Sequence, residues 1–379
     1  MREGWRIVKL DEIISFERGL TYAKGDEVAH SSVGVLRSNN VDLTTQSLNL
    51  DEIKYLREDF EVPEKKKVRK SSLLMCMSNG SKDHLGKVAL IDEDLDYAFG
   101  GFMGLLTPDE TKVVPKYLYY ALASKSFKDY IHSLADGANI NNLKYKDLAA
   151  YAILLLPLPE QQRIVDILDR EFAKIDALKA NAEKSLQAAR DLFQATLKKE
   201  LEPKERWEIK AFDACIEKSK APTKLLSSSY QEKGQFPIVS QEKDLISGYW
   251  DNHEDLFVHR KPVVVFGDHT MVVKYIDFNF VVGADGVKIL EPKDFLLPKY
   301  FFYWVSSVHI KRRGYARHFR YLRESSIPIP SIPEQQRIVD ILDNVSTRTA
   351  ALKDNANKML SSCDDLKQSL LRKAFNGEL

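Results

Sequence analysis

The chain has 379 residues, enough for two or three domains with cores of their own, and its apolar (44%) and charged (29%) contents are ordinary for a globular protein. A formal net charge of +1 excludes a global basic field, so a nucleic-acid partner would have to meet local basic patches. Cys76, Cys215 and Cys363 form no Cys-x-x-Cys pair, which argues against a zinc site or a disulfide framework and favours reduced thiols in the cytoplasm. No apolar run approaches the length of a membrane span.

The N-terminal segment, residues 1–156, is predicted to be a mixed α and β globule. The string "SLLMCMSNGSKDHLGKVALID" at 72–92 predicts a strand, a polar turn and a second strand. The string "PKYLYYALAS" at 115–124 predicts a short amphipathic helix that begins at a proline. The glycine-rich "FGGFMG" at 99–104 does not match the dinucleotide-binding pattern and indicates tight turns.

Residues 157–200 are predicted to form one long helix, because they contain neither proline nor glycine after Pro159. The helix opens with "PEQQRIVDILD" at 159–169, in which Glu160 suits a helix N-terminus. Apolar residues then recur at heptad spacing, which favours a coiled coil. The predicted stripe is Ile164, Leu168, Ile175, Leu178, Ala182, Ala189 and Leu192, with Glu171 and Ser185 as interruptions.

Residues 201–330 echo the first globule loosely. Trp207 matches Trp5, "PKYFFYWVSS" at 298–307 matches the earlier helix, and "PVVVFGDHTMVVKYID" at 262–277 matches the earlier pair of strands. The second globule is therefore also predicted to be mixed α and β. The order globule, long helix, globule, long helix defines the fold class that we expect: α+β, pseudo-two-fold symmetric, with an antiparallel coiled coil.

Residues 331–379 repeat the long helix and add a C-terminal tail. The string "PEQQRIVDILD" returns letter for letter at 333–343, an offset of 174 residues that also aligns "LFQATLKK" with "LKQSLLRK". Two identical helix openings predict helices that pair with each other, and two unrelated core helices are the alternative. The second stripe is Ile338, Leu342, Val345, Leu352, Ala356, Met359, Cys363, Leu366 and Leu370, interrupted by Thr349.

Two similar heads on one spacer have the symmetry with which dimeric proteins reach two DNA half-sites. The second head offers "KRRGYARHFRYLR" at 311–323, where basic and aromatic residues alternate as in nucleic-acid surfaces. The first head offers "GANINNLKYKDL" at 137–148, whose amides suit adenine edges. A solvated helix end and ordinary turn-forming asparagines remain alternatives.

The candidate DNA-binding residues lie in polar loops and in these two segments. In the first head they are Arg37, Asn39, Asn40, Asn79, Ser81, Lys82, Asn139, Asn141, Asn142, Lys144, Tyr145 and Lys146. In the second head they are Gln241, His269, Arg312, Arg313, Arg317, Phe319, Arg320 and Tyr321.

The doubled helix opening, the tail "LKQSLLRKAFNGEL" and the alternation of heads and helices resemble the specificity subunit of type I restriction-modification systems, over the whole chain. The resemblance implies two target-recognition domains, 1–156 and 201–330, that read the two halves of an asymmetric, bipartite double-stranded DNA site. It implies that the helices set the spacer and dock two methylase (modification) subunits, with two restriction/translocase subunits completing the complex. One departure is that the first helix ends in "KKELEPKERW" and lacks the "AFNGEL" form.

Catalysis by this chain is not expected. The sequence has no Asn/Asp-Pro-Pro-Tyr/Phe stretch of an amino-methyltransferase, no phosphate-binding GxxxxGK[ST] loop and no zinc pattern, so no cofactor or metal is predicted. Two alternatives stay open at this point. One is a non-catalytic coiled-coil adaptor that binds only protein, and the other is a standalone DNA-modifying enzyme with an unrecognised site.

Overall fold

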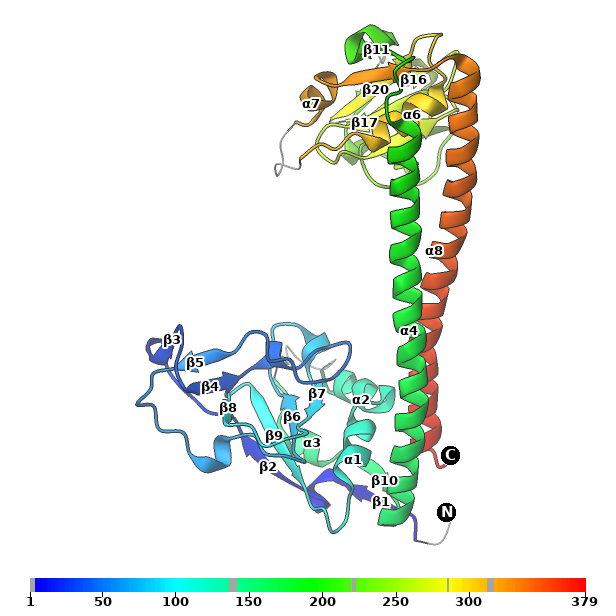
Figure 1. The fold of residues 1–379 in the computed structure, drawn as a ribbon. Coiled ribbons are helices and arrows are strands. Elements are labelled where there is room, and N and C mark those ends of the chain that lie inside the picture. The colour runs from blue at the N-terminus through cyan, green and yellow to red at the C-terminus, as the bar shows by residue number, and fades with distance from the viewer. Residues whose placement is uncertain (1–3, 136–141, 218, 220–222, 285, 312–316) are drawn as a thin grey trace. The chain divides into compact units, whose positions relative to one another are not determined.

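A computed structural model describes residues 4–135, 142–217, 219, 223–284, 286–311 and 317–379. It divides into two compact units, one of Met1–Asn181 with Met359–Leu379 and one of Ala182–Lys358. Each unit contains one head and a part of each long helix (Figure 1). No helix in the described ranges combines the length and the apolar character that a bilayer span needs.

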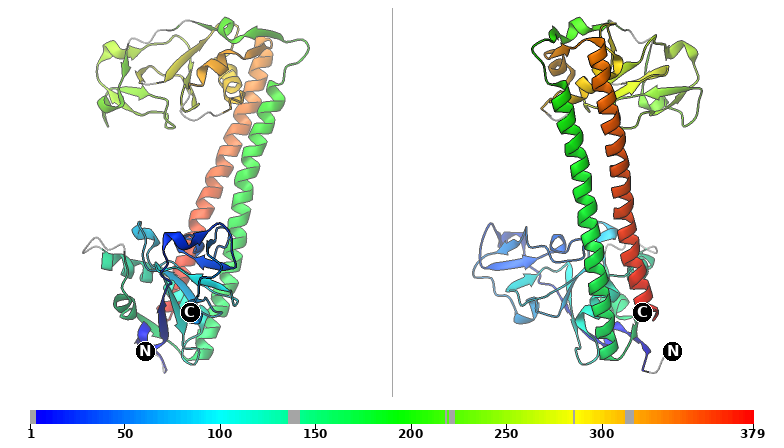
Figure 2. Two further views of the ribbon diagram at one scale, coloured as in Figure 1. Left: turned by 90° about the vertical axis from the view of Figure 1, so that its left-hand side faces the viewer. Right: turned by 45° about the vertical axis from the view of Figure 1, so that its right-hand side comes forward.

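The two long helices have the positions predicted for them. α4 spans Leu158–Leu201 and α8 spans Ile332–Phe375. In the first unit the late part of α8 lies beside the early part of α4, with Lys179 paired to Asp364 at 2.7 Å. In the second unit Arg337 of α8 reaches Glu200 of α4 at 2.9 Å. The helices therefore pack antiparallel, as predicted, and run side by side in both views of Figure 2.

The predicted apolar stripe is only partly buried. One line of residues, which we call the seam, is buried along the two helices, namely Ile164, Leu168, Ile175, Ala182 and Ala189 of α4 and Ile338, Leu342, Thr349, Ala356 and Cys363 of α8. Thr349 does not interrupt this seam, because its hydroxyl donates to the Val345 carbonyl at 2.8 Å. Val345 and Leu370 of the predicted stripe are half-buried, and five other stripe residues stay 44–51% exposed, since two helices alone cover one narrow face of each other. These half-exposed residues are Leu178, Leu192, Leu352, Met359 and Leu366.

The first head is built from antiparallel sheets with one parallel pair. β2-β9-β6-β7 form one sheet, β3-β5-β4-β8 form another, and β1 pairs with β10. The strands are β1 Arg6–Lys9, β2 Ile14–Arg18, β3 Glu27–Val28, β4 Val33–Leu36, β5 Lys54–Leu56, β6 Leu73–Cys76, β7 Val88–Leu90, β8 Tyr97–Phe99, β9 Met103–Pro108 and β10 Ala152–Leu155. The helices are α1 Pro115–Leu122, α2 Lys125–Ala135 and α3 Tyr145–Ala149.

The second head repeats this plan. β12-β20-β17-β18 form one sheet, β13-β19-β14-β15 form another with β16 beside β19, and β11 pairs with β21. The strands are β11 Glu208–Ala211, β12 Ile216–Glu217, β13 Lys224–Leu225, β14 Phe236–Val239, β15 Gly248–Trp250, β16 Leu256–Phe257, β17 Val263–Gly267, β18 Val273–Ile276, β19 Phe280–Gly283, β20 Val287–Pro292 and β21 Ser326–Ile329. The helices are α5 Phe212–Cys215, α6 Pro298–Ser307 and α7 Phe319–Arg323.

The fold class predicted from the sequence is therefore confirmed. The hairpins β6–β7 and β17–β18 and the proline-started helices α1 and α6 also match the predicted elements. A buried glutamine in each copy of the doubled string explains how a head is fixed to its helix.

Gln161 is fully buried at the start of α4. Its Oε1 accepts the N–H of Val114, the residue that precedes α1, at 2.8 Å. Its Nε2 donates to the carbonyls of Lys112 at 3.0 Å and Leu156 at 2.7 Å. One amide thus ties α4, the start of α1 and the end of β10 together, and every hydrogen bond it makes satisfies a backbone group.

Gln335 repeats the arrangement in the second unit and is also fully buried. Its Oε1 accepts the N–H of Leu297 before α6 at 2.8 Å. Its Nε2 donates to the carbonyls of Phe295 at 2.8 Å and Pro330 at 2.9 Å. We call this three-bond arrangement, centred on Gln161 in one unit and on Gln335 in the other, the glutamine dock.

An aspartate two turns further along each helix adds a second tie. Asp169 accepts a hydrogen bond from the Tyr120 hydroxyl of α1 and pairs with Lys116 at 2.8 Å. In the second unit Asp343 accepts from the Tyr303 hydroxyl of α6 at 2.5 Å. Burial, and then the aspartate contact, raise the pKa of both phenols.

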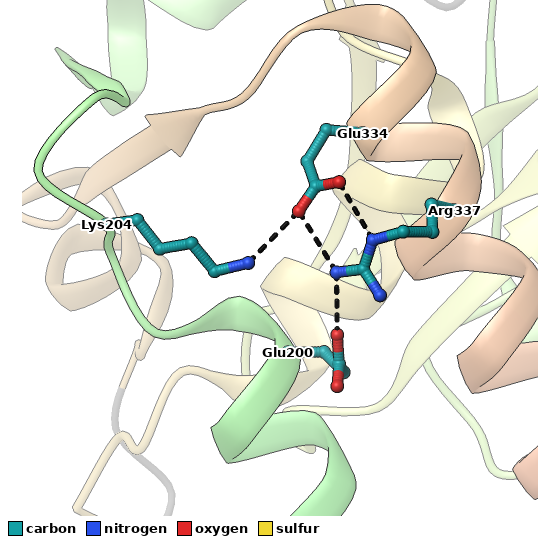
Figure 3. A network of polar contacts seen from close by, with 4 residues as sticks. All are labelled: Glu200, Lys204, Glu334 and Arg337. Carbon is teal, nitrogen blue, oxygen red and sulfur yellow. Dashed lines mark hydrogen bonds and ion pairs between the residues drawn. The ribbon is translucent and has the colours of Figure 1, made fainter.

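The glutamate and arginine of the repeated string form an ion pair in both units. In the second unit, Figure 3 shows the Glu334 carboxylate between Arg337 (2.8 Å) and Lys204 (3.0 Å), with Arg337 also reaching Glu200. Arg337 first, and then Lys204, lower the pKa of Glu334 to about 2. In the first unit, Arg163 pairs with Glu160 and donates to the carbonyl of Leu379 at 2.9 Å.

Replacing Gln161 or Gln335 by leucine should destabilise the corresponding unit by about 3 kcal/mol, because one N–H and two carbonyls would stay buried without a partner. Urea unfolding combined with amide exchange of α1 or α6 measures the loss and assigns it to a unit. The neighbours Gln162 and Gln336 are matched controls, since each is exposed and bonds only an aspartate on its own helix. Equal effects of the buried and exposed substitutions would contradict the assignment.

Candidate functional site

Three polar loops of the first head converge. Arg37–Asn40 follows β4, Ser78–Lys82 follows β6, and residues 142–144 precede α3. Asn79 Nδ2 donates to the Ser38 hydroxyl at 2.8 Å, which joins the first two loops. The third joins through a bridge between Ser78 and Asn142. The structure therefore brings together residues that are about a hundred positions apart in the sequence.

Lys87 fixes the loop Arg37–Asn40 from inside the first head. Its side chain is buried, and its ammonium group donates to the carbonyls of Ser38 at 2.6 Å and Val41 at 2.7 Å. Burial lowers the pKa of this lysine. Sequence reasoning missed Lys87, because a lysine in a strand-forming segment gives no sign that it is turned inward.

The loop after β4 contains both structural and available side chains. Asn40 is buried, and its amide is used within the protein, accepting from the Arg37 N–H at 2.8 Å and donating to the carbonyls of Asn49 and Glu52. Asn39 likewise donates to the Glu52 carbonyl at 3.0 Å. Asn40 therefore shapes the loop from inside, and its expected DNA-binding role stays a prediction.

Arg37 is the available group of this loop. Its side chain is half-buried beside Gly100, and its Nε has no hydrogen-bond partner among the residues that the structure describes. Burying part of a guanidinium without a partner is costly. An anionic or acceptor-rich ligand would remove that cost.

The segment around α3 presents an exposed basic and aromatic edge. Asn142, Lys144, Tyr145 and Lys146 are exposed, and the Tyr145 ring stacks on Phe16 with centroids 4.5 Å apart. Ser81 and Lys82 are exposed in the neighbouring loop. Asn139 and Asn141 lie outside the described residues.

Equivalent loops meet in the second head. Gln241, which follows β14, accepts the N–H of His269 in the β17–β18 turn at 3.2 Å and the hydroxyl of Thr270 at 2.7 Å. The segment before α7 joins through the His318 N–H, which donates to the Asp268 carbonyl at 2.8 Å. The same three positions of the fold are thus polar in both heads, with different residues at each.

Asp268 organises the basic segment of the second head. Its carboxylate is 3% exposed, accepts the N–H of Phe319 at the start of α7 at 2.8 Å, and lies 3.7 Å from the Lys288 ammonium group. This fixes α7 against the end of β17. Sequence reasoning did not single out Asp268 or Lys288, since nothing local shows that they meet α7.

A hollow of about 460 Å³ lies over this segment and has a basic rim. Arg317, Arg320, Arg323 and Lys288 line it together with Asp268 and Phe319. The Arg320 guanidinium stacks on the Tyr321 ring at 4.5 Å, while Arg323 pairs with Asp213 at 2.9 Å. Arg317 and Arg320 are exposed. Arg312 and Arg313 lie outside the described residues.

The described side chains of these surfaces carry guanidinium, ammonium, amide, hydroxyl and aromatic groups. Within the described part of the chain, His, Cys, Asp and Glu side chains form no group of three or more that could hold a metal ion. Cys76 and Cys215 are buried, and burial raises the pKa of both thiols. Guanidinium, ammonium, amide and aromatic groups on loop tips suit phosphates and base edges.

Comparison with protein families agrees with the doubled architecture. A model described as "Type I restriction modification DNA specificity domain" matches residues 2–188 and, a second time, residues 204–361. The chain belongs to this family. Each match begins near the start of a head and extends into a long helix, so both units are family domains.

Curated relatives match part or all of this chain, and solved structures match it over its whole length. The EcoKI specificity subunit of Escherichia coli K12 is 24% identical over all of this chain and 89% of its own length. The StySPI specificity subunit of Salmonella potsdam is 29% identical over 52% of this chain and 42% of its own. The HsdS subunit from Thermoanaerobacter tengcongensis shares the fold, with TM-score 0.57 and 18% identity over 100% of this chain and 98% of its own.

A second solved structure shares the specificity-family fold more closely. It is described as "Structural basis underlying complex assembly and conformational transition of the type I R-M system" and has TM-score 0.75 with 19% identity, covering 100% of this chain and 99% of its own. The resemblance drawn from the doubled helix opening is thus confirmed at the level of the family.

Proposed function

We propose that this chain is the DNA-binding specificity subunit of a type I restriction-modification complex and reads a bipartite, asymmetric double-stranded site. Residues 1–156 and 201–330 are the two target-recognition domains in this proposal. The observation that carries it is the convergence of three polar loops at the same place in both heads, with different side chains in each. Two such surfaces in one chain suit two half-sites of different sequence.

The two heads would use different chemistry. In the first head Arg37 and Asn79 offer guanidinium and amide groups that pair with guanine and adenine edges, beside Lys144 and Lys146 for phosphates. In the second head the rim of Arg317 and Arg320 would neutralise phosphates, while Gln241 and His269 would meet base edges. Asp268 and Lys87 position these groups without touching DNA.

The half-exposed stripe on the helices would receive the partner subunits. Leu178, Met359 and Leu366 belong to the first unit, and Leu192 and Leu352 belong to the second. The 174-residue offset relates Leu178 to Leu352 and Leu192 to Leu366, so the same surface occurs twice. Two equivalent apolar surfaces suit two modification subunits, which with two restriction/translocase subunits would supply the catalysis that this chain lacks.

Removing the positive charge of Arg317 and Arg320 together should weaken DNA binding on all sequences and flatten its salt dependence. The slope of log affinity against log salt falls by about one for each lost phosphate contact, so the double alanine variant should lose up to about two units. Fluorescence anisotropy at several salt concentrations measures this with the reconstituted complex. The control variant Arg348→Ala with Lys358→Ala removes the same amount of charge from α8. If it changed the salt dependence equally, the effect would come from net charge alone.

Aspartate at Leu178 and Leu366 should remove one modification subunit and leave the other bound, because the changes lie in one unit only. Aspartate at Leu192 and Leu352 should remove the opposite one. Mass photometry of mixed complexes should then show the specificity chain with one partner in place of two. Retention of two partners by both variants, with helix content unchanged by circular dichroism, would exclude the stripe as the docking surface.

Lengthening both helices should lengthen the preferred DNA spacer. Four residues inserted after Ala182 and after Ala356 add about 6 Å to each helix and about 40° beyond a full turn. Two additional base pairs lengthen the DNA by about 7 Å and rotate it by about 70°, which comes close to the change in each helix. Selection from DNA with a randomised spacer length measures the preferred spacer. A variant with seven inserted residues should bind DNA worse, because the added rotation of its helices fits that of three base pairs poorly. A folded four-residue variant that still selects the original spacer would show that the helices do not set the distance.

A further inference from the structure

Phe102 is an exposed aromatic residue that no part of the proposal has used. It lies in the turn between β8 and β9, and its side chain is 70% exposed. None of the other large apolar side chains in the described ranges is more exposed. From the sequence, the string that contains it, "FGGFMG", indicated only tight turns.

The backbone of this turn is fixed on several sides. The Gly100 N–H donates to the Leu36 carbonyl, and the Met103 N–H donates to the Gly100 carbonyl, both at 2.8 Å. The Phe102 carbonyl accepts the N–H groups of Met77 at 2.9 Å and Ser78 at 3.1 Å. A side chain held on so rigid a base loses little conformational entropy when it binds.

The same hydrogen bonds place Phe102 within the candidate site. Leu36 directly precedes Arg37, and Ser78 directly precedes Asn79, so the turn is bonded to both loops that carry these residues. The Arg37 side chain lies beside Gly100. An apolar ring thus extends into solvent from a turn that is bonded to both loops of the candidate site.

DNA offers one apolar group on its major-groove base edges, the 5-methyl group of thymine. Phenylalanine is among the side chains that contact this methyl group. We propose that Phe102 is a specificity-determining residue that selects thymine at one position of the half-site bound by the first head. The proposal rests on the proposed function and adds a residue and a base to it.

The second head provides an internal contrast. The sequence between β19 and β20 contains Ala284 and Gly286 among the described residues and has no aromatic residue. The selection by Phe102 therefore applies to one half-site only, and the other half-site serves as a control within the same DNA molecule.

The test replaces thymine by deoxyuridine, which keeps the base pair and lacks only the methyl group. The site is first selected from random DNA with the reconstituted complex, and each thymine is then replaced singly. We expect wild type to lose about fourfold in affinity at one thymine of the first half-site, which corresponds to about 0.8 kcal/mol for one buried methyl group. Phe102→Ala should lose affinity for thymine DNA and become insensitive to deoxyuridine at that position.

Two further variants make the test specific. Phe102→Leu keeps an apolar contact and should retain part of the thymine preference. Ile7→Ala removes a similarly exposed side chain (65%) on the β1–β10 pair and should leave every preference unchanged. Deoxyuridine in the second half-site should affect Phe102→Ala and wild type equally.

Three results would overturn the proposal. Phe102→Ala could stay as sensitive to deoxyuridine as wild type, or lose affinity equally on both DNAs, which would make the ring a non-specific wedge. The first half-site could also contain no thymine on either strand. If wild type selects no sequence at all, the proposed function itself fails and Phe102 loses its role with it.

Discussion

The architecture depends on a buried amide at the start of each long helix. Gln161 and Gln335 each satisfy one backbone N–H and two carbonyls that would otherwise be buried without partners. Three hydrogen bonds with fixed directions from one side chain define how a head meets its helix more strictly than apolar packing would. Any function that needs a head at a defined orientation on its helix therefore depends on the glutamine dock.

This constraint explains why eleven residues occur twice. In both copies the glutamate and arginine pair, the first glutamine is buried, the second glutamine bonds the aspartate four residues later, and the last aspartate receives a tyrosine hydroxyl. Three apolar residues of each copy are buried in the core of the adjacent head, namely Ile164, Val165 and Leu168 in the first unit and Ile338, Val339 and Leu342 in the second. Most letters of the string therefore have the same contact in both units, and the buried glutamine is the one that forms the dock. The recognition loops lie outside the doubled string and differ in sequence between the two heads.

The sequence predicted the parts of the fold that are encoded locally or repeated. Helix positions followed from the absence of proline and glycine, and the hairpins followed from alternating apolar and polar runs. The exposure of Leu178 and Met359 could not be predicted from the sequence, because heptad spacing does not show how many helices pack together. The site was predicted as a set of loops, but its organisation by Lys87 and Asp268, the burial of Asn40 and the position of Phe102 depend on contacts between distant segments.

The proposed function divides the chain into a constant and a variable part. The glutamine dock and the helices would determine where half-sites lie and what partners bind, and the loop tips would determine which bases are read. Substitutions on the tips could then change the target without altering the assembly. This division also assigns catalysis to the partner subunits of the proposal.

The central claim is that two unlike heads read two unlike half-sites on one DNA. Long-read sequencing of DNA from cells that express this chain with its modification subunit, in a host without other adenine methylation, measures it directly. We predict methylated adenines only within one asymmetric motif, made of two short specified segments separated by a fixed number of unspecified base pairs. A single contiguous motif, a palindrome, or methylation without sequence preference would contradict the account.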